Sequence, residues 1–289
     1  MKIVGIDAGG TKTEFLLCDE SETVLKRVVL GTGNPNDIGI EACISLLAKG
    51  LDELCGDEIP DAVFAGVSGG GFGENCEKIR AFLEARYPTS KVANGTDAIN
   101  LLYCASTAEN CGALICGTGS ALFIRRGEEI LRMGGWGHLF DLGGSGYDIG
   151  RDAIRVLLEA EETAQEKLDL PLCKALRARL GRSAHEILGD FYTKGKSYIA
   201  SFAPLVFEAL EAGDTDAQRI VEANAQAVAD RISLAVRTWG ALSQIICAGG
   251  LFSSSFFFDA LSARVDVPLF VPDVSPAMGA CRKALSLVS

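Results

Sequence analysis

The chain contains the same kind of glycine-rich turn twice, and this repetition constrains its fold more than any other feature. The first copy lies within residues 3–19 and the second within residues 113–124. In each copy an apolar strand, a short turn of glycine with threonine or serine, and a second apolar strand follow one another, which is the pattern of a β-hairpin. A single copy is explained by an ordinary hairpin. Two matching copies indicate a pair of equivalent hairpins that face each other around a ligand.

The turns have the chemistry of an anion site. Glycine lacks a Cβ atom, so the chain can turn sharply and come close to a ligand, and successive N–H groups of such a turn converge on an anion. We therefore expect these turn residues to bind a phosphate: Gly9, Gly10, Thr11, Lys12 and Thr13 in the first copy, and Thr118, Gly119 and Ser120 in the second. Neither turn is a P-loop, since no Gly-Lys-Ser/Thr sequence occurs at either turn. Neither fits the dinucleotide-binding motif, since a strand rather than a helix follows.

One acidic residue accompanies the first turn. Asp7 ends the first strand, directly before the glycines. A carboxylate beside a phosphate site repels the anion unless a cation lies between them. The pattern therefore predicts a Mg²⁺ ion at Asp7, with phosphate oxygens and water completing its shell.

The composition excludes several partners. The formal net charge is −11, which argues against nucleic acid or an anionic membrane as the main partner. No stretch of the sequence has the length of a membrane-spanning helix, and the N-terminus leads straight into a strand rather than a secretion signal. We therefore expect a cytoplasmic protein whose 10 cysteines, which are scattered and form no CxxC pair, are free and mostly buried thiols.

The order of predicted elements repeats along the chain. The apolar periodicity predicts strands at 2–8, 13–19, 23–30, 61–67 and 91–94, and helices at 38–55, 74–86 and 97–105. It then predicts strands at 112–117, 120–126, 129–133, 242–248 and 267–271, helices at 253–263 and 276–287, and a long helical region at 151–240. Without that region the second half has the βββαβαβα order of the first. A repeated α/β unit predicts two similar lobes with a cleft, and ligands of such folds lie at the carboxyl ends of the strands.

The expected fold class is therefore α/β, with duplicated βββαβαβα lobes and a helical insert in the second lobe. We assign residues 1–107 and 276–289 to the first lobe, and residues 108–275, with the insert 151–240, to the second. The helices of the insert contribute either to the core or to a dimer contact, and we expect a homodimer.

Several motifs resemble those of the BadF/BadG/BcrA/BcrD-type ATPase family, and most closely its N-acetylglucosamine kinase branch, within the sugar kinase, Hsp70 and actin superfamily. The motifs that carry this resemblance cover nearly the whole chain and lie at residues 5–13, 33–35, 95–97, 117–120, 134–138, 145–151 and 248–250. The Gly-Gly-Trp-Gly-His run followed by Gly-Ser-Gly-Tyr is the most specific among them. The resemblance implies a ribonuclease H-like, actin-type fold that binds Mg²⁺ and ATP.

The resemblance also implies roles on the phosphate side of the site. Asp97 matches the general base that takes the proton of the sugar hydroxyl, a role that needs a carboxylate within hydrogen-bond reach of the attacking oxygen. The alternative is that Asp97 only caps the following helix. The hydroxyl-bearing turns match the residues around the ATP phosphates. Gly249 and Gly250 match a turn that contacts adenosine, although a simple strand-to-helix connection explains them equally well.

Further matches lie on the acceptor side. The residues implied to contact the sugar are Asn34, Asn36, Gly135, Trp136, Gly137, Asp141, Ser145 and Gly146, together with Asp97. For Trp136 the alternative is packing in the core. The chain departs from the family where Leu142 occupies the position of a sugar-binding aspartate, with Asp141 one residue earlier, and where Asn36 replaces an aromatic residue of the mammalian enzymes. N-acetylglucosamine, glucosamine and N-acetylmuramic acid therefore all remain open as acceptors.

Three functions are compatible with these features. The first is ATP-dependent phosphorylation of a small-molecule amino sugar. The second is an ATPase activator of a radical dehydratase, which would hold an iron–sulfur cluster between two subunits through cysteines. The third is a sugar sensor without catalysis. The sequence favours the kinase, because the cysteines lack a paired motif and no basic DNA-binding segment is present.

Overall fold

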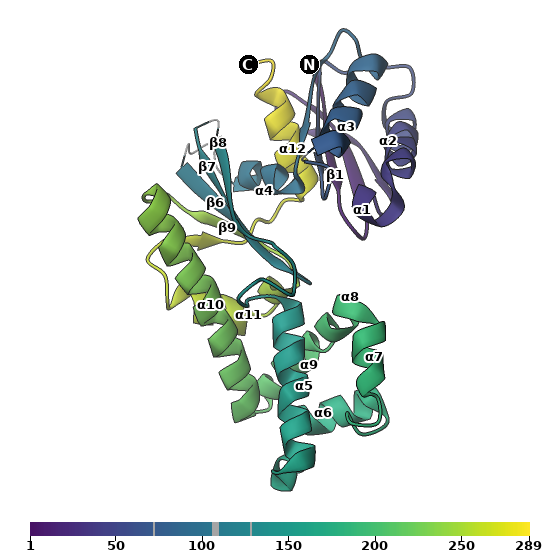
Figure 1. Cartoon of the computed structure of the whole chain (residues 1–289). Coiled ribbons are helices and arrows are strands. Elements are labelled where there is room, and N and C mark those ends of the chain that lie inside the picture. Colours follow the sequence, from purple (N-terminus) through teal and green to yellow (C-terminus); the bar gives the residue numbers. More distant parts are fainter. Residues whose placement is uncertain (72, 106–109, 128) are drawn as a thin grey trace. The chain divides into compact units, whose positions relative to one another are not determined.

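The computed structural model describes residues 1–71, 73–105, 110–127 and 129–289. The chain divides into two compact units, residues 1–108 with 272–289 and residues 109–271 (Figure 1). Both termini therefore belong to the first unit. Each unit is built around its own five-stranded sheet.

The sheet of the first unit combines a meander with two parallel strands. Its strands are β1 (Lys2–Ala8), β2 (Thr13–Asp19), β3 (Val24–Leu30), β4 (Ala62–Val67) and β5 (Lys91–Gly95), in the spatial order β3-β2-β1-β4-β5. β1 pairs antiparallel with β2 and parallel with β4. The turn between β1 and β2 therefore lies beside the carboxyl ends of β4 and β5, where α/β folds bind ligands.

Helices cover both faces of this sheet. They are α1 (Pro35–Ile38), α2 (Ile40–Cys55), α3 (Gly73–Arg86), α4 (Asp97–Ala105) and α12 (Pro276–Leu285). Alternate residues of β1 face opposite sides of the sheet. Val4 and Ile6 pack in the cluster with α2 and α3, whereas Ile3 packs in the cluster with α12. The C-terminal helix thus completes the core of the first unit.

The packing of α12 against α4 depends on one glycine. A Cβ atom at Gly279 would overlap the carbonyl oxygen of Asn100 in α4, which belongs to a rigid backbone. Overpacking in a well-packed core costs about 1–3 kcal/mol. We expect Gly279→Ala to lower the free energy of unfolding by at least that amount, measured by urea denaturation. Gly189→Ala is the control, because a Cβ atom there meets open space; equal losses in the two variants would contradict the packing argument.

The sheet of the second unit repeats the topology of the first. Its strands are β6 (Asn110–Cys116), β7 (Ser120–Arg126), β8 (Glu129–Gly134), β9 (Ile245–Ala248) and β10 (Leu269–Phe270), in the spatial order β10-β9-β6-β7-β8. β6 pairs antiparallel with β7 and parallel with β9, as β1 does with β2 and β4. The prediction of a duplicated α/β fold is confirmed.

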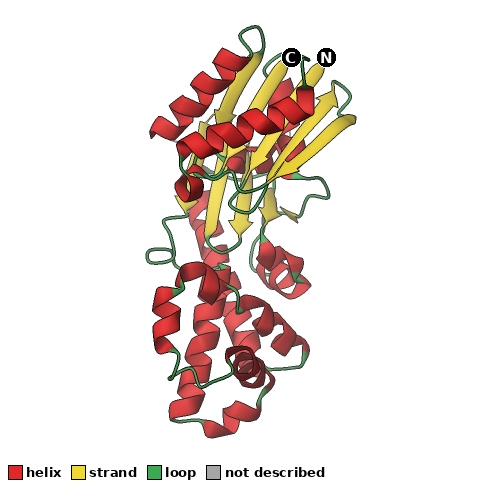
Figure 2. Ribbon diagram, turned by 90° about the vertical axis from the view of Figure 1, so that its right-hand side faces the viewer, coloured by secondary structure: helices red, strands yellow, loops and turns green. Residues whose placement is uncertain are grey.

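A helical part is inserted between β8 and β9. It comprises α5 (Gly146–Glu162), the short 3-10 helix η1 (Gln165–Asp169), α6 (Pro171–Leu180), α7 (Leu188–Thr193), α8 (Gly195–Ala200), α9 (Ala203–Glu211) and α10 (Thr215–Trp239). After β9 follow a second 3-10 helix, η2 (Gly250–Ser253), and α11 (Ser255–Ser262). Figure 2 shows the inserted part as helices joined by loops. Its apolar faces join the sheet in one core.

Some element boundaries differ from those predicted. The insert begins at Gly146 rather than 151, because Ser145 and Asp148 form a capping box at the start of α5. Gly150 lies inside this helix, where a Cβ atom would overlap the carbonyl oxygen of Ile199. Residues 35–38 form a separate short helix, and the last predicted strand, 267–271, shortens to β10. Within the described residues, no helix is long and apolar enough to cross a membrane.

Candidate active site

The first glycine turn is closed by backbone hydrogen bonds. The N–H group of Gly9 donates to the carbonyl oxygen of Lys12 (2.9 Å), and the carbonyl oxygen of Gly9 accepts from the N–H group of Gly33 (3.0 Å). Gly10, Thr11 and Lys12 are exposed at the tip. Their N–H groups and the Thr11 hydroxyl are available to an anion approaching the turn.

Thr13 differs from its neighbours in the turn. Its side chain is fully buried, and its hydroxyl has no hydrogen-bond partner among the described residues. A Cβ atom on Gly33 would overlap this hydroxyl, so the glycine is what leaves space for it. Contact between Thr13 and a phosphate stays a prediction.

Asp7 is held in place by a residue of α4. The side-chain amide of Asn100 donates to Oδ1 of Asp7 (2.7 Å) and to the carbonyl oxygen of Ile6 (3.2 Å). The pKa of Asp7 is raised to about 6, mainly by burial; the hydrogen bond from Asn100 opposes this shift, and the charges of Asp97 and Glu14 add to it. An acidic side chain that is costly to ionise, with other carboxylates nearby, favours the approach of a cation.

These residues fit Mg²⁺ in its usual mode of binding. In the part of the chain that the structure describes, no three acidic, histidine or cysteine side chains converge to ligate a metal by themselves. Mg²⁺ is commonly held through one or two carboxylates, with water and substrate phosphates as its other ligands. Asp7 beside the exposed tip of the first turn suits that arrangement.

Asn100 was not singled out by the sequence. It is fully buried in α4, three residues after Asp97, and so lies on the same helix face as Asp97. A Cβ atom on Gly66 of β4 would overlap its side chain, so that glycine makes the space it occupies. A polar residue within an otherwise apolar helix was the only local signal for this role.

Asp97 is the first residue of α4 and is half-buried. The hydroxyl of Thr96 donates to Oδ1 of Asp97 (2.9 Å). The N–H group of Ile99 donates to the carbonyl oxygen of Thr96, so Thr96 occupies the position before the helix. Among the hydrogen bonds of the described residues, no backbone N–H group donates to the Asp97 carboxylate. The capping alternative is therefore not what the structure shows, and this carboxylate remains available to a ligand.

The loop after β4 lies against Asn34 and Asn36 at one point and against Thr96 at another. A Cβ atom on Gly69 would lie 2.5 Å from Oδ1 of Asn34, and one on Gly71 would lie 2.5 Å from the N atom of Thr96. The loop after β4 thus touches both the asparagines and the residue that precedes Asp97. The side chain of Asn34 caps α1 by accepting from the N–H group of Asn36 (2.9 Å). Asn36 is exposed.

The second glycine turn supports the start of α5. The N–H group of Gly117 donates to the carbonyl oxygen of Gly119 (2.9 Å), and the N–H group of Gly146 donates to the carbonyl oxygen of Gly117 (2.7 Å). Thr118 and Gly119 are exposed, whereas Ser120 is buried. Oγ of Ser120 accepts a hydrogen bond from Arg231 of α10 (2.6 Å). The exposed part of this turn therefore consists of backbone groups and the Thr118 hydroxyl.

Gly249 and Gly250 lie next to the second turn. Gly249 has a φ of +105°, and a Cβ atom there would overlap the carbonyl group of Cys116 at the end of β6. This conformation and close approach require glycine. Gly250 is exposed and meets open space. Their contact with adenosine stays a prediction.

The loop after β8 exposes apolar side chains. Trp136 is 65% exposed, so it does not pack in the core, and the guanidinium of Arg132 lies 4.6 Å from its ring centroid. Gly135 and Gly137 both have positive φ. The same loop carries further large apolar side chains that are exposed: Leu139, Phe140 and Leu142.

Three residues expected to contact sugar have structural partners in this loop. Oδ2 of Asp141 accepts from the N–H group of Gly137 (3.0 Å) and closes the loop. Ser145 is buried in the capping box of α5, and Gly146 is buried at its first turn. Leu142 is 89% exposed and offers no polar group. Whether Asp141 reaches a sugar in place of Leu142 stays a prediction.

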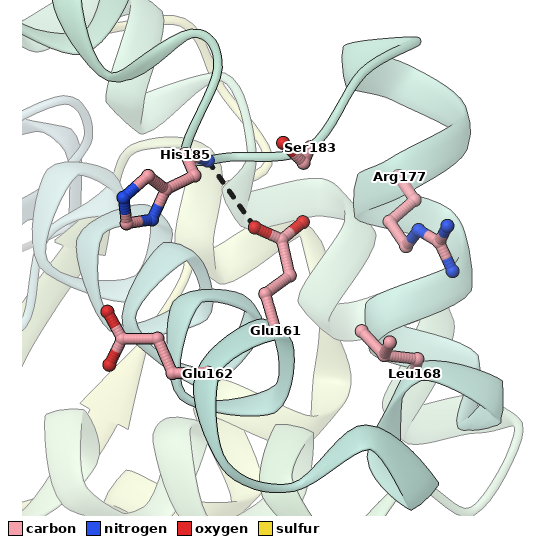
Figure 3. Close-up of a pocket in the computed structure, with 6 residues that line it drawn as sticks. All are labelled: Glu161, Glu162, Leu168, Arg177, Ser183 and His185. Atoms are coloured by element: carbon pink, nitrogen blue, oxygen red, sulfur yellow. Dashed lines mark hydrogen bonds between the residues drawn. The ribbon is translucent and has the colours of Figure 1, made fainter.

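Two cavities of the second unit lie within its helical part. One, of about 420 Å³, is lined by Glu161, Glu162, Leu168, Arg177, Ser183 and His185 (Figure 3). In it the carboxylate of Glu161 accepts from the N–H groups of Ala184 and His185, so this side chain holds the loop before α7. The other cavity is lined by α5, α7 and α8 and by His138 and Leu139 of the loop after β8. Neither includes a residue of the glycine turns.

All 10 cysteines are free, as predicted. Nine are buried and Cys76 is partly buried. Burial raises the pKa of several of these thiols, to about 11 for Cys43 and about 12 for Cys104. Thiols of this kind contribute to packing and are poor metal ligands and nucleophiles.

Known proteins resemble this chain over most of its length. The profile of the BadF/BadG/BcrA/BcrD ATPase family matches residues 4–282. An N-acetyl-D-glucosamine kinase of Dictyostelium discoideum is 25% identical over an alignment of 312 positions, gaps included, which covers 98% of this chain and 97% of that protein. An N-acetylmuramic acid/N-acetylglucosamine kinase of Clostridium acetobutylicum is 29% identical over 231 residues, which cover 76% and 74%. A solved structure, a candidate N-acetylglucosamine kinase of Chromobacterium violaceum, covers 100% of this chain and 99% of its own at 21% identity and a TM-score of 0.76.

Proposed function

We propose that this chain, which belongs to the BadF/BadG/BcrA/BcrD ATPase family, transfers the terminal phosphoryl group of ATP to a hydroxyl of an amino sugar. The observation that carries the proposal is the arrangement in the first unit. There, Asp7 directly precedes the first glycine turn, and Asp97 at the start of α4 is close enough for its charge to raise the pKa of Asp7. The relatives named N-acetylglucosamine kinase and N-acetylmuramic acid/N-acetylglucosamine kinase support the class of reaction.

On the donor side, the exposed N–H groups and hydroxyls of the two turns bind the phosphates of ATP. Thr11 and Lys12 contribute from the first turn, and Thr118 and Gly119 from the second. Gly249 and Gly250 lie against adenosine. Mg²⁺, when bound at Asp7, would neutralise part of the charge of the phosphates. Asn100 fixes the orientation of the Asp7 carboxylate.

On the acceptor side, Asp97 takes the proton of the attacking hydroxyl as general base. Thr96 holds one oxygen of Asp97 by its hydroxyl, which leaves the other oxygen free to accept from the sugar. Such positioned bases typically contribute 10²- to 10⁴-fold to the rate. Asn34 and Asn36 contribute polar groups to the binding of the sugar, and Trp136 contributes an exposed apolar surface.

The acceptor is tested by a direct screen. The purified chain, ATP and Mg²⁺ are incubated with N-acetylglucosamine, glucosamine, N-acetylmuramic acid and glucose, and ADP release is measured. We expect kcat/KM for at least one amino sugar to exceed that for glucose by about tenfold or more, because a site with polar groups for the amino substituent discriminates against its absence. Equal use of glucose, or ADP release that no sugar stimulates, would overturn the proposal.

The cysteines do not favour the activator of a radical dehydratase. Ligands of an iron–sulfur cluster shared between subunits must be surface thiolates, and nine of the ten thiols are buried. An iron and sulfide determination on anaerobically purified protein distinguishes the two functions: a bound cluster would contradict the kinase.

Two further features belong to the proposal. We place the enzyme in the cytoplasm and expect it to act as a homodimer. Light scattering on the purified chain gives the oligomeric state, and a monomer at working concentrations would contradict the second expectation.

A further inference from the structure

Arg231 is a buried cation for which the described part of the chain provides no ionic partner. It lies within α10 and is only 9% exposed, among the apolar residues Val228, Ile232 and Ala235 of the same helix. Arginine is rarely buried unless it is paired, because removing its charge from water is costly. Within the described residues, Arg231 forms no ion pair. Its placement therefore points to a negative charge that reaches it from a ligand.

The guanidinium contacts the last residue of the second glycine turn, Ser120. Nη1 donates to Oγ of Ser120 (2.6 Å) and Nη2 donates to the carbonyl oxygen of Gly143 (3.2 Å). Gly134, at the end of β8, has a φ of +77°, and a Cβ atom there would lie 3.1 Å from Cζ of Arg231. The glycine-rich segment thus leaves space for the guanidinium as well as forming its own turns.

The contact fixes the direction of the Ser120 hydroxyl. A hydroxyl has one proton to donate and two lone pairs. Because the guanidinium can only donate, the oxygen of Ser120 acts as acceptor toward Arg231, and its proton points elsewhere. The one other neighbour of this hydroxyl in the described structure is the thiol of Cys116, at 3.7 Å, which is a weak acceptor. The proton of Ser120 is thus left for a stronger acceptor next to the turn.

We propose that Arg231 is a positioning residue for the nucleotide, which holds Ser120 as a donor and makes the potential at the second turn positive, so that this turn selects the phosphates of ATP. The inference rests on the proposed function, since it assigns ATP to these turns. It predicts that Arg231 contributes to the binding of phosphates and not to the binding of adenosine.

The experiment compares the affinities of ATP with Mg²⁺ and of adenosine for the full chain by calorimetry. We expect Arg231→Met to weaken ATP binding about 10- to 100-fold, the range for a lost hydrogen bond to a charged group, and adenosine binding less than about twofold. Ser120→Ala should weaken ATP binding too, and the double variant should lose little more than Arg231→Met, because the two residues act together. In the kinase assay, KM for ATP should rise more than kcat falls.

Controls separate this role from a purely structural one. Arg237→Met removes an exposed arginine from the same helix and should leave both affinities unchanged. Arg231→Lys keeps the charge and is expected to recover part of the ATP affinity; it also serves if Arg231→Met does not fold. Parallel losses of ATP and adenosine affinity, or unchanged ATP affinity, would overturn the inference. Wild-type protein that binds adenosine but not ATP would overturn the proposed function instead.

Discussion

Asp97→Asn should abolish most phosphoryl transfer while leaving ATP binding intact. The substitution keeps the size of the side chain and its hydrogen bond from Thr96, but removes the carboxylate that accepts the proton of the sugar hydroxyl. We expect kcat to fall about 10²- to 10⁴-fold. The affinity for ATP with Mg²⁺ should hold or increase slightly, because the Asp97 charge raises the pKa of Asp7 and its removal makes Asp7 easier to ionise.

Steady-state kinetics with the preferred amino sugar, together with calorimetry for ATP, check this prediction. Glu74→Gln is the matched control: it also removes a carboxylate from the first turn of a helix, but Glu74 is exposed and its one ion pair among the described residues is with Lys78. The control should retain wild-type kcat, since a helix-end charge alone has only a small effect on the helix. If Asp97→Asn kept kcat within a fewfold of wild type, another group would have to act as the base.

The parts of the fold that the sequence predicted are those with strong local patterns. The two hairpins, the parallel strands and the start of α4 at Asp97 follow from apolar alternation and glycine positions, which act within a few residues. The early start of α5 was also readable, because Ser145 and Asp148 have the spacing of a capping box. It was missed because the glycines around them are typical of a loop. The structure shows why a glycine is needed inside this helix, because Gly150 packs against the backbone of Ile199.

The supporting residues of the site were not readable in this way. The other residues of α4 and α10 are sufficient to predict these helices, so Asn100 and Arg231 add no signal of their own. Their partners are far away in sequence. Asn100 reaches Asp7 only because Gly66 leaves space, and Arg231 reaches Ser120 beside Gly134. Both contacts arise from tertiary packing, which no local periodicity encodes. The burial of Thr13 is of the same kind: its place in the turn suggests a ligand contact, while its side chain is fully buried and lies against Gly33.

Asp7→Asn should inactivate the enzyme and yet stabilise the metal-free protein at neutral pH. The pKa of Asp7 is raised by burial from 3.8 to about 6, so the folded protein holds this proton more tightly than the unfolded chain. Stability therefore falls as pH rises from about 4 to about 6, and the loss persists above that range. An asparagine has no proton to lose. We expect Asp7→Asn to be more stable at pH 7.5 by about 1–3 kcal/mol and to lose the pH dependence that this group causes.

The same substitution removes the carboxylate proposed to hold Mg²⁺. A metal that neutralises phosphate charge is worth several kcal/mol, so activity should fall by about 10²-fold or more. Urea unfolding in EDTA at pH 5, 6.5 and 7.5, with kinase assays over a range of Mg²⁺ concentrations, separates the two effects. Asp57→Asn, at an exposed position, should change neither. A variant less stable than wild type at pH 7.5 would show that the hydrogen bond from Asn100 outweighs the cost of the buried charge. Activity should fall and stability should rise in the same variant for one reason. The charge of Asp7 is needed to hold the cation, whereas without the cation this buried charge destabilises the folded protein.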